Sequence, residues 1–130
     1  MVLVRAPEAL FGARIVAAPD VLDALPIPEG PVALRLAPDE LFVLVRSGKF
    51  TAIFPEPGIV EDEHGFVGWW LTPDEVAEVA HHVEWTIPST RPVLAQGLIA
   101  GVPSGLWLTD DRALLLCAAA YAHELVERLP

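Results

Sequence analysis

The sequence contains one cysteine, Cys117, and one lysine, Lys49. A lone cysteine excludes an internal disulfide framework and a metal site built from several cysteines. No segment has the apolar core of a signal peptide, and none reaches the 18 apolar residues of a membrane-spanning helix. We therefore expect a cytoplasmic protein without a membrane partner.

Positive charge is scarce. Eight Lys and Arg residues stand against eighteen Asp and Glu, for a net charge of −10. A surface that binds phosphate groups needs clustered positive charge, which argues against nucleic acid and anionic lipid as partners. A glycine-rich phosphate loop is also missing, because Gly97, Gly101 and Gly105 lie four residues apart in strand-like sequence.

What the chain has in abundance is apolar side chains, which make up 53% of its 130 residues. This length predicts one domain over residues 1–130 with a substantial core. A domain of this size cannot bury so much apolar surface by itself. We therefore expect a homo-oligomer or a protein partner that covers the excess.

The first half predicts short elements. Val2 and Val4 suggest an edge strand, and Ala18-Pro19-Asp20 suggests a helix start that Pro26 ends. Residues 32–36 and 41–45 alternate as two strands, joined by a turn at residues 37–40. Residues 49–54 suggest a third short strand. The acidic run at residues 61–65 predicts a solvated turn.

The second half carries the clearest local signals. After a strand at residues 66–71, Thr72, Pro73 and Glu75 form a capping-box pattern, which predicts a helix from Pro73 to about Val83. Residues 94–102 predict one strand. Residues 105–108 and 113–117 predict a strand pair across a turn, and a closing helix follows through residue 129 with a Glu124–Arg128 pair. The order predicts an α+β fold, a ferredoxin-like two-layer sandwich with a mostly antiparallel sheet and helices on one face.

Three segments of the chain resemble a known family. Residues 95–129, AQGLIAGVPSGLWLTDDRALLLCAAAYAHELVERL, resemble the end of sarcosine oxidase gamma subunits, which are relatives of the aminomethyltransferase domain of the glycine cleavage T protein. Residues 58–80, GIVEDEHGFVGWWLTPDEVAEVA, and residues 33–45, ALRLAPDELFVLV, are similar to earlier parts of that family. The resemblance covers about two thirds of the chain in the same order, and the chain looks shorter than the family between Val45 and Gly58.

The resemblance implies an α+β subunit that packs against a larger folate- or flavin-dependent partner. It supplies no catalytic residue and no cofactor of the chain's own, because gamma subunits are non-catalytic.

The four tryptophans are the main candidate site. Trp69 and Trp70 are adjacent on a predicted strand, so their side chains point to opposite faces. One enters the core, and the other is either covered by the chain's own loops or available as an interface anchor or ligand wall. Trp85 and Trp107 are expected nearby. We favour an interface over a ligand site.

Other chemistry-bearing residues give weaker signals. His81 and Glu84, with His82 between them, could share a metal on a helix, helped by Glu63 or His64, but a solvated helix end explains them as well. His123 and Glu124 are neighbours on a helix and point to different sides, so they do not form an acid–base pair. Cys117 is expected to be small core filler rather than a nucleophile.

Two functions are consistent with these features. The first is a non-catalytic interaction or oligomerisation domain that resembles the gamma subunit. The second is a small-molecule-binding or enzymatic ferredoxin-like homodimer of the cofactor-independent monooxygenase type, with a Trp- and His-lined cavity. A flat apolar surface would support the first, and a cavity with converging His or Arg side chains would support the second.

Overall fold

The computed structural model describes residue 3 and residues 5–27, 30–45 and 58–129. The chain forms two compact units, a smaller one of residues 10–64 and a larger one of residues 1–9 and 65–130. The prediction that residues 1–130 are a single domain stays a prediction. The suggested strands at Val2 and Val4 and at residues 49–54 lie outside the described residues.

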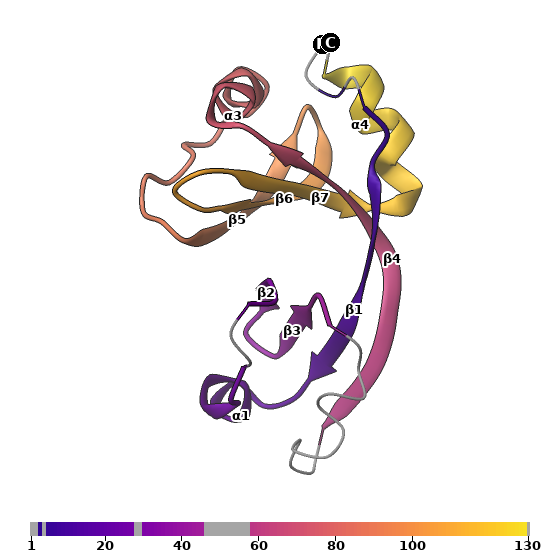
Figure 1. Cartoon of the computed structure of the whole chain (residues 1–130), viewed down its shortest axis with the longest axis vertical. Helices are drawn as coiled ribbons and strands as arrows, with labels where there is room; N and C mark the ends of the chain where they lie inside the picture. Colours follow the sequence, from indigo (N-terminus) through magenta and orange to yellow (C-terminus); the bar gives the residue numbers. More distant parts are fainter. Residues whose placement is uncertain (1–2, 4, 28–29, 46–57, 130) are drawn as a thin grey trace. The chain divides into compact units, whose positions relative to one another are not determined.

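The smaller unit combines strands with one short helix. Its elements are β1 (Glu8–Val16), α1 (Pro19–Ala24), β2 (Ala33–Ala37), β3 (Glu40–Val43) and the first half of β4 (Ile59–Leu71), with the strands in the order β2-β3-β1-β4 (Figure 1). As predicted, β2 and β3 pair across a two-residue turn. Leu34 lies opposite Phe42, and both side chains are fully buried.

The helix α1 starts where the sequence predicted it, with Pro19 in its first turn. Leu22 and Leu25 pack with Ile15 and Val43 into the core of the smaller unit. This helix has only six residues. A helix of this length is not stable in isolation, so its stability comes from that packing.

The acidic run at residues 61–65 is not the turn that its composition predicted. It continues β4, which runs from Ile59 to Leu71. Arg14 on the neighbouring strand forms ion pairs with Glu61, at 3.0 Å, and with Glu40. The hydrogen bond to Glu40, aided by that to Glu61, raises the pKa of Arg14. Strand pairing and this charge compensation override the low strand propensity of acidic residues.

The larger unit holds the remaining elements: the second half of β4, α3 (Pro73–Ala80), β5 (Val93–Ile99), β6 (Val102–Leu108), β7 (Ala113–Ala118), a 3₁₀ turn (Ala119–Tyr121) and α4 (Ala122–Arg128). The strand order is β4-β7-β6-β5, with every pair antiparallel. On one sheet face, which we call the core face, Trp69, Leu106 and Leu115 pack with Val79 of α3 and Leu125 of α4. The opposite face of β7 is buried as well, which explains its unbroken apolar run.

Residues 94–102 form a hairpin rather than the predicted single strand. Strand β5 ends at Ile99, and β6 begins at Val102. Ala100 and Gly101 make the turn with φ angles of 50° and 79°. Two positive φ values in succession are the geometry of tight two-residue hairpins, but alanine is a poor signal for it. Leu98 and Val102 consequently lie on opposite faces, with Leu98 exposed and Val102 buried.

The helix α3 begins as predicted. The Thr72 hydroxyl accepts from the Glu75 amide, at 3.2 Å, and the Glu75 carboxylate accepts from the Thr72 amide, at 3.0 Å. The helix ends at Ala80, three residues earlier than expected. Just after this end, the His82 carbonyl accepts a hydrogen bond from the Ala100 amide in the β5–β6 turn, at 2.9 Å. This carbonyl is therefore bonded to the turn instead of to a further turn of helix.

We expect Thr72→Ala to lower the free energy of unfolding by about 1 kcal/mol, because it removes one half of the capping box. Urea denaturation measures the change. Thr86→Ala, at an exposed position outside any helix or strand, is the matched control and should have almost no effect. An equal loss in both variants would contradict the role of the cap.

The C-terminal helix is shorter than predicted. Ala118 belongs to β7, and a 3₁₀ turn separates it from α4. Leu125 and Leu129 are buried, and the predicted Glu124–Arg128 ion pair is confirmed. Within the described part of the chain, no helix is long and apolar enough to cross a membrane.

The α+β class and the mostly antiparallel sheet are confirmed. The ferredoxin-like sandwich is not. That fold places a helix between its third and fourth strands. Here β5, β6 and β7 follow one another without an intervening helix, and α4 comes only after β7.

Candidate functional site

The structure divides the four tryptophans between the two faces of the larger unit's sheet. Trp69 lies on the core face and is 1% exposed, with its indole N–H donating to the Arg5 carbonyl at 3.1 Å. Trp85 packs against that same cluster, over Gly97, and donates to the Leu98 carbonyl at 2.9 Å. Trp85 therefore lies on the same face of the sheet as Trp69.

Trp70 and Trp107 lie on the opposite face, which we call the outer face. Both are in register with Leu114, so the three side chains form one row across β4, β7 and β6. The guanidinium of Arg112 covers Trp70 at 3.8 Å from the ring centroid. Trp70 is thus covered by a residue of the β6–β7 turn, one of the two alternatives that the sequence left open.

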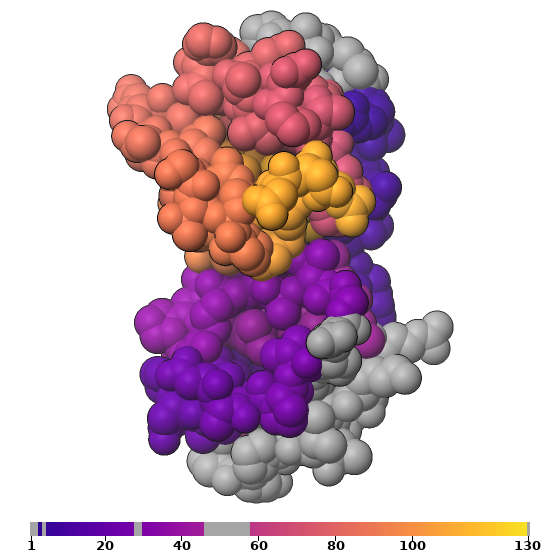
Figure 2. Space-filling view, turned by 60° about the vertical axis from the view of Figure 1, so that its left-hand side comes forward, coloured from indigo at the N-terminus to yellow at the C-terminus, as the bar shows by residue number. Residues whose placement is uncertain are grey.

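The outer face of the β5–β6 hairpin is apolar and partly open. Leu98 is 56% exposed and lies directly opposite the exposed Pro103. Four residues further along, beyond the Gln96–Gly105 pair, Trp107 is paired with Leu94, and both are half-buried. We call these four residues the β5–β6 patch. In Figure 2 the orange part of the chain, which includes β5, is visible at the molecular surface.

The sequence did not single out Leu98. In one continuous strand over residues 94–102, Leu98 shares a face with Ala100 and Val102. The turn at Ala100 and Gly101 reverses the chain and leaves Leu98 exposed.

The histidines contribute less. Because α3 ends at Ala80, His81 and Glu84 do not share a helical face. Within residues 3, 5–27, 30–45 and 58–129, no three His, Cys, Asp or Glu side chains lie close enough to hold a metal ion. His64 lies against Phe11, with ring centroids 5.5 Å apart.

His123 is exposed on a helix, and Cys117 is buried in the core. His123 lies 3.1 Å from Glu127, one helical turn away, and both side chains are exposed. Cys117 is 2% exposed, and burial raises its thiol pKa to about 11. A thiol with that pKa is almost entirely protonated at neutral pH and is a poor nucleophile.

A charged cluster joins the N-terminal segment to α3. Arg5 forms an ion pair with Glu75, at 3.2 Å, and also donates to the Trp70 carbonyl. The hydrogen bond from Arg5 lowers the pKa of Glu75, and the hydrogen bond from the Thr72 amide adds to the effect. Glu75 therefore serves the helix cap and the N-terminal segment together.

This lowered pKa makes a pH-dependent contribution to stability. Since the folded-state pKa of Glu75 lies below its unfolded value, the stabilisation is complete above the unfolded pKa and is lost as the pH falls through the folded pKa. We expect Glu75→Gln to cost under about 1 kcal/mol at pH 7, because Arg5 is largely exposed to solvent. The cost should shrink in acid. Denaturation as a function of pH tests this against Glu78→Gln, and a cost that does not change with pH would contradict it.

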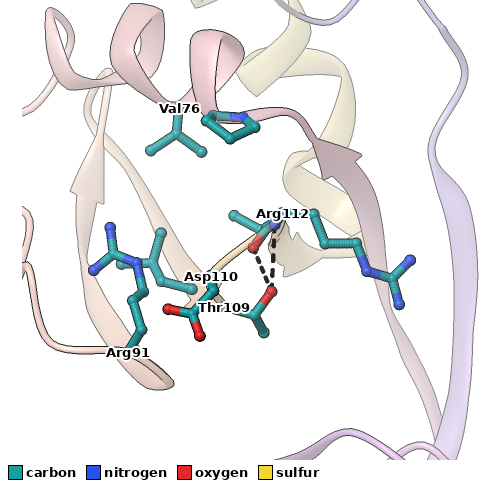
Figure 3. Close-up of a pocket in the computed structure, with 8 residues that line it drawn as sticks. Val76, Arg91, Thr109, Asp110 and Arg112 are labelled. Atoms are coloured by element: carbon teal, nitrogen blue, oxygen red, sulfur yellow. Dashed lines mark hydrogen bonds between the residues drawn. The ribbon is translucent and has the colours of Figure 1, made fainter.

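A cavity of about 110 Å³ lies beside the start of α3 (Figure 3). It is lined by Pro73, Val76, Arg91, Leu108, Thr109, Asp110, Arg112 and Ala113. The Thr109 hydroxyl is held within the β6–β7 turn by the Arg112 carbonyl, at 2.8 Å. Small-molecule and cofactor pockets usually measure about 300–1,000 Å³, so only a much smaller ligand fits here.

Comparison with known proteins adds one finding. No protein-family model matches the chain, and no curated protein sequence matches it. Among solved structures, a chain of heterotetrameric sarcosine oxidase from Corynebacterium sp. U-96, in complex with pyrrole 2-carboxylate, matches with a TM-score of 0.73. The match covers 95% of this chain and 79% of that chain at 19% identity.

The chain has the fold of a sarcosine oxidase subunit. The two coverages also show that the matched chain is the longer of the two, although not greatly so. The family resemblance predicted from the sequence is confirmed at the level of the fold. The shorter length of this chain, which the sequence located between Val45 and Gly58, agrees with the coverages, although that segment lies mostly outside the described residues.

Proposed function

We propose that this chain is a non-catalytic subunit of a multi-subunit enzyme and that it packs against a larger folate- or flavin-dependent subunit. The observation that carries the proposal is the match of 95% of the chain to a chain of a heterotetrameric enzyme. The residues with catalytic potential support it, because Cys117 is buried with a raised pKa and His123 is paired on an exposed helix surface.

The β5–β6 patch is the surface that we assign to this partner. Single exposed apolar residues are common, but here Leu98 and Pro103 are adjacent, and Leu94 and Trp107 continue the patch. Residues 94, 96, 98, 103, 105 and 107 on this face carry no charge, whereas 20% of the chain is charged. A scarcity of charged residues together with an aromatic side chain is typical of the centre of a protein interface.

The alternative function, a homodimeric small-molecule binder, calls for a Trp- and His-lined cavity. The cavity of Figure 3 includes neither residue type, although Arg91 and Arg112 line it. A wider pocket of about 410 Å³ in the larger unit includes His123 and Arg5 but no tryptophan. The exposed apolar β5–β6 patch favours the interaction function.

The test is to purify the tagged full-length chain from its source cell and to measure the mass of the complex by light scattering. We expect a complex of fixed stoichiometry with a flavin absorbance spectrum or bound folate, and with oxidation of a secondary amine such as sarcosine. The chain alone should be inactive. A tight homodimer without a partner, or amine oxidation by the chain alone, would overturn the proposal.

A further inference from the structure

Most of the arginines that the structure describes are paired with carboxylates. The described residues include six arginines and no lysine. Four of the arginines form ion pairs with carboxylates: Arg5 with Glu75, Arg14 with Glu40 and Glu61, Arg35 with Asp23, and Arg128 with Glu124. Such pairing is expected in a chain with more than twice as many acidic as basic residues.

The two arginines of the described residues that lack a carboxylate partner, Arg91 and Arg112, both line the cavity of Figure 3. They differ in what their side chains do. Arg112 points away from the cavity toward β4, and its guanidinium stacks on Trp70. The charge of Arg112 is therefore already used to cover an aromatic ring.

Arg91 remains available. Its Nη1 donates to the Pro88 carbonyl and, at 3.0 Å, to the Thr90 carbonyl. These bonds fix the guanidinium in place without neutralising it. Among the described residues no further hydrogen bond uses its Nη2 or Nε. Two donors on one edge of a guanidinium match the two oxygens of a carboxylate.

The other residues that line the cavity restrict the kind of ligand that it can bind. Asp110 lines the cavity on the side of Arg91, and within the described residues its carboxylate has no hydrogen bond or ion pair (Figure 3). Its negative charge disfavours a dianion. Val76, Leu108 and Ala113 add apolar walls. A cavity of about 110 Å³ holds a group of the size of acetate.

We infer that this cavity is a binding site for a small monocarboxylate, held by the guanidinium of Arg91. The carboxylate is either a free small molecule or the side chain of an Asp or Glu residue on a partner subunit. The inference goes beyond the proposed function and does not depend on it, because every lining residue belongs to the larger unit of this chain.

The experiment is an NMR titration of the isotopically labelled full chain with sodium acetate, at ionic strength held constant with sodium chloride. We expect saturable chemical-shift changes of the Arg91 Nε–H and of the Thr109 and Asp110 amides, with a dissociation constant in the millimolar range. Sulfate should bind more weakly. Arg91→Gln should weaken acetate binding at least about tenfold, because it removes a charge-assisted pair of hydrogen bonds. Asp110→Asn should strengthen it, because it removes a repelling charge.

Arg112→Gln is the matched control, since it removes an arginine of the same cavity whose guanidinium points elsewhere. It should leave acetate affinity within about twofold of the unchanged chain. Arg91→Lys keeps the charge and should retain part of the affinity, which separates ligand binding from support of the Pro88–Thr90 backbone. Shifts that persist in Arg91→Gln, equal losses in both Gln variants, or tighter binding of sulfate would overturn the inference.

The two sources of the carboxylate are distinguished in the purified complex. A free ligand leaves the site open, so acetate still shifts the Arg91 signal. A partner side chain blocks acetate in the complex, and Arg91→Gln then weakens the association. Failure of the chain to form a complex at all would refute the proposed function but leave acetate binding to the isolated chain intact.

Discussion

Trp69→Ala should lower the free energy of unfolding by about 3–5 kcal/mol. The Trp69 side chain is 1% exposed, lies opposite Leu115 in the sheet, and donates its indole N–H to the Arg5 carbonyl. The substitution leaves a large cavity in the core face and an unpaired carbonyl. Since small domains are stable by only about 5–15 kcal/mol, this one change can consume much of the total. Urea denaturation measures the loss.

Two further variants make this expectation specific. Trp69→Phe keeps most of the apolar volume and loses only the indole N–H, so it should remain folded with a smaller loss. Trp70→Ala removes the neighbouring ring, which is half-buried under Arg112 on the outer face. We expect a loss of about 1–2 kcal/mol from reduced burial and the lost cation–π contact. Equal losses for Trp69→Ala and Trp70→Ala would contradict the assignment of the two rings to different faces.

Leu98→Asp should leave the chain folded and weaken its association with the partner subunit at least about 30-fold, which corresponds to about 2 kcal/mol. Leu98 is 56% exposed, so its loss costs the isolated chain little. In an apolar interface the new carboxylate would be buried without a partner, and that desolvation is expensive. The measurement is the dissociation constant of the complex, together with the thermal midpoint of the isolated chain.

Ile59→Asp is the matched control, because Ile59 is 55% exposed and lies on β4 in the smaller unit. It should leave the association unchanged. If both variants weakened the complex equally, the effect would be one of added charge rather than of the β5–β6 patch. If only Ile59→Asp weakened it, the interface would include the smaller unit instead.

Helix-start signals were the most reliable guides to local structure. The Thr72 capping box and the proline that opens α1 depend on contacts within a few residues, so the sequence alone identifies them. The acidic run at residues 61–65 shows the opposite case. Its composition favours a turn, but pairing with β1 and the ion pair to Arg14, 47 residues away, hold it in a strand.

The candidate site divides in the same way. The alternation of strand side chains was enough to place Trp69 and Trp70 on opposite faces. It follows that one of the two rings is buried in the core. Which ring is buried, and that Arg112 covers the other, depends on how β4 pairs with β7 and on where the β6–β7 turn lies.

By itself the sequence determined the α+β class, the acid-rich surface, the starts of α1 and α3, the β2–β3 and β6–β7 hairpins, and the resemblance to sarcosine oxidase gamma subunits. These features follow from side-chain periodicity, local hydrogen bonds and composition. Only the tertiary structure decided that residues 94–102 form a hairpin, that Leu98 is exposed, and that Arg91 and Asp110 share a cavity. These three depend on positive φ angles at Ala100 and Gly101 and on contacts between distant segments, and periodicity carries no information about either.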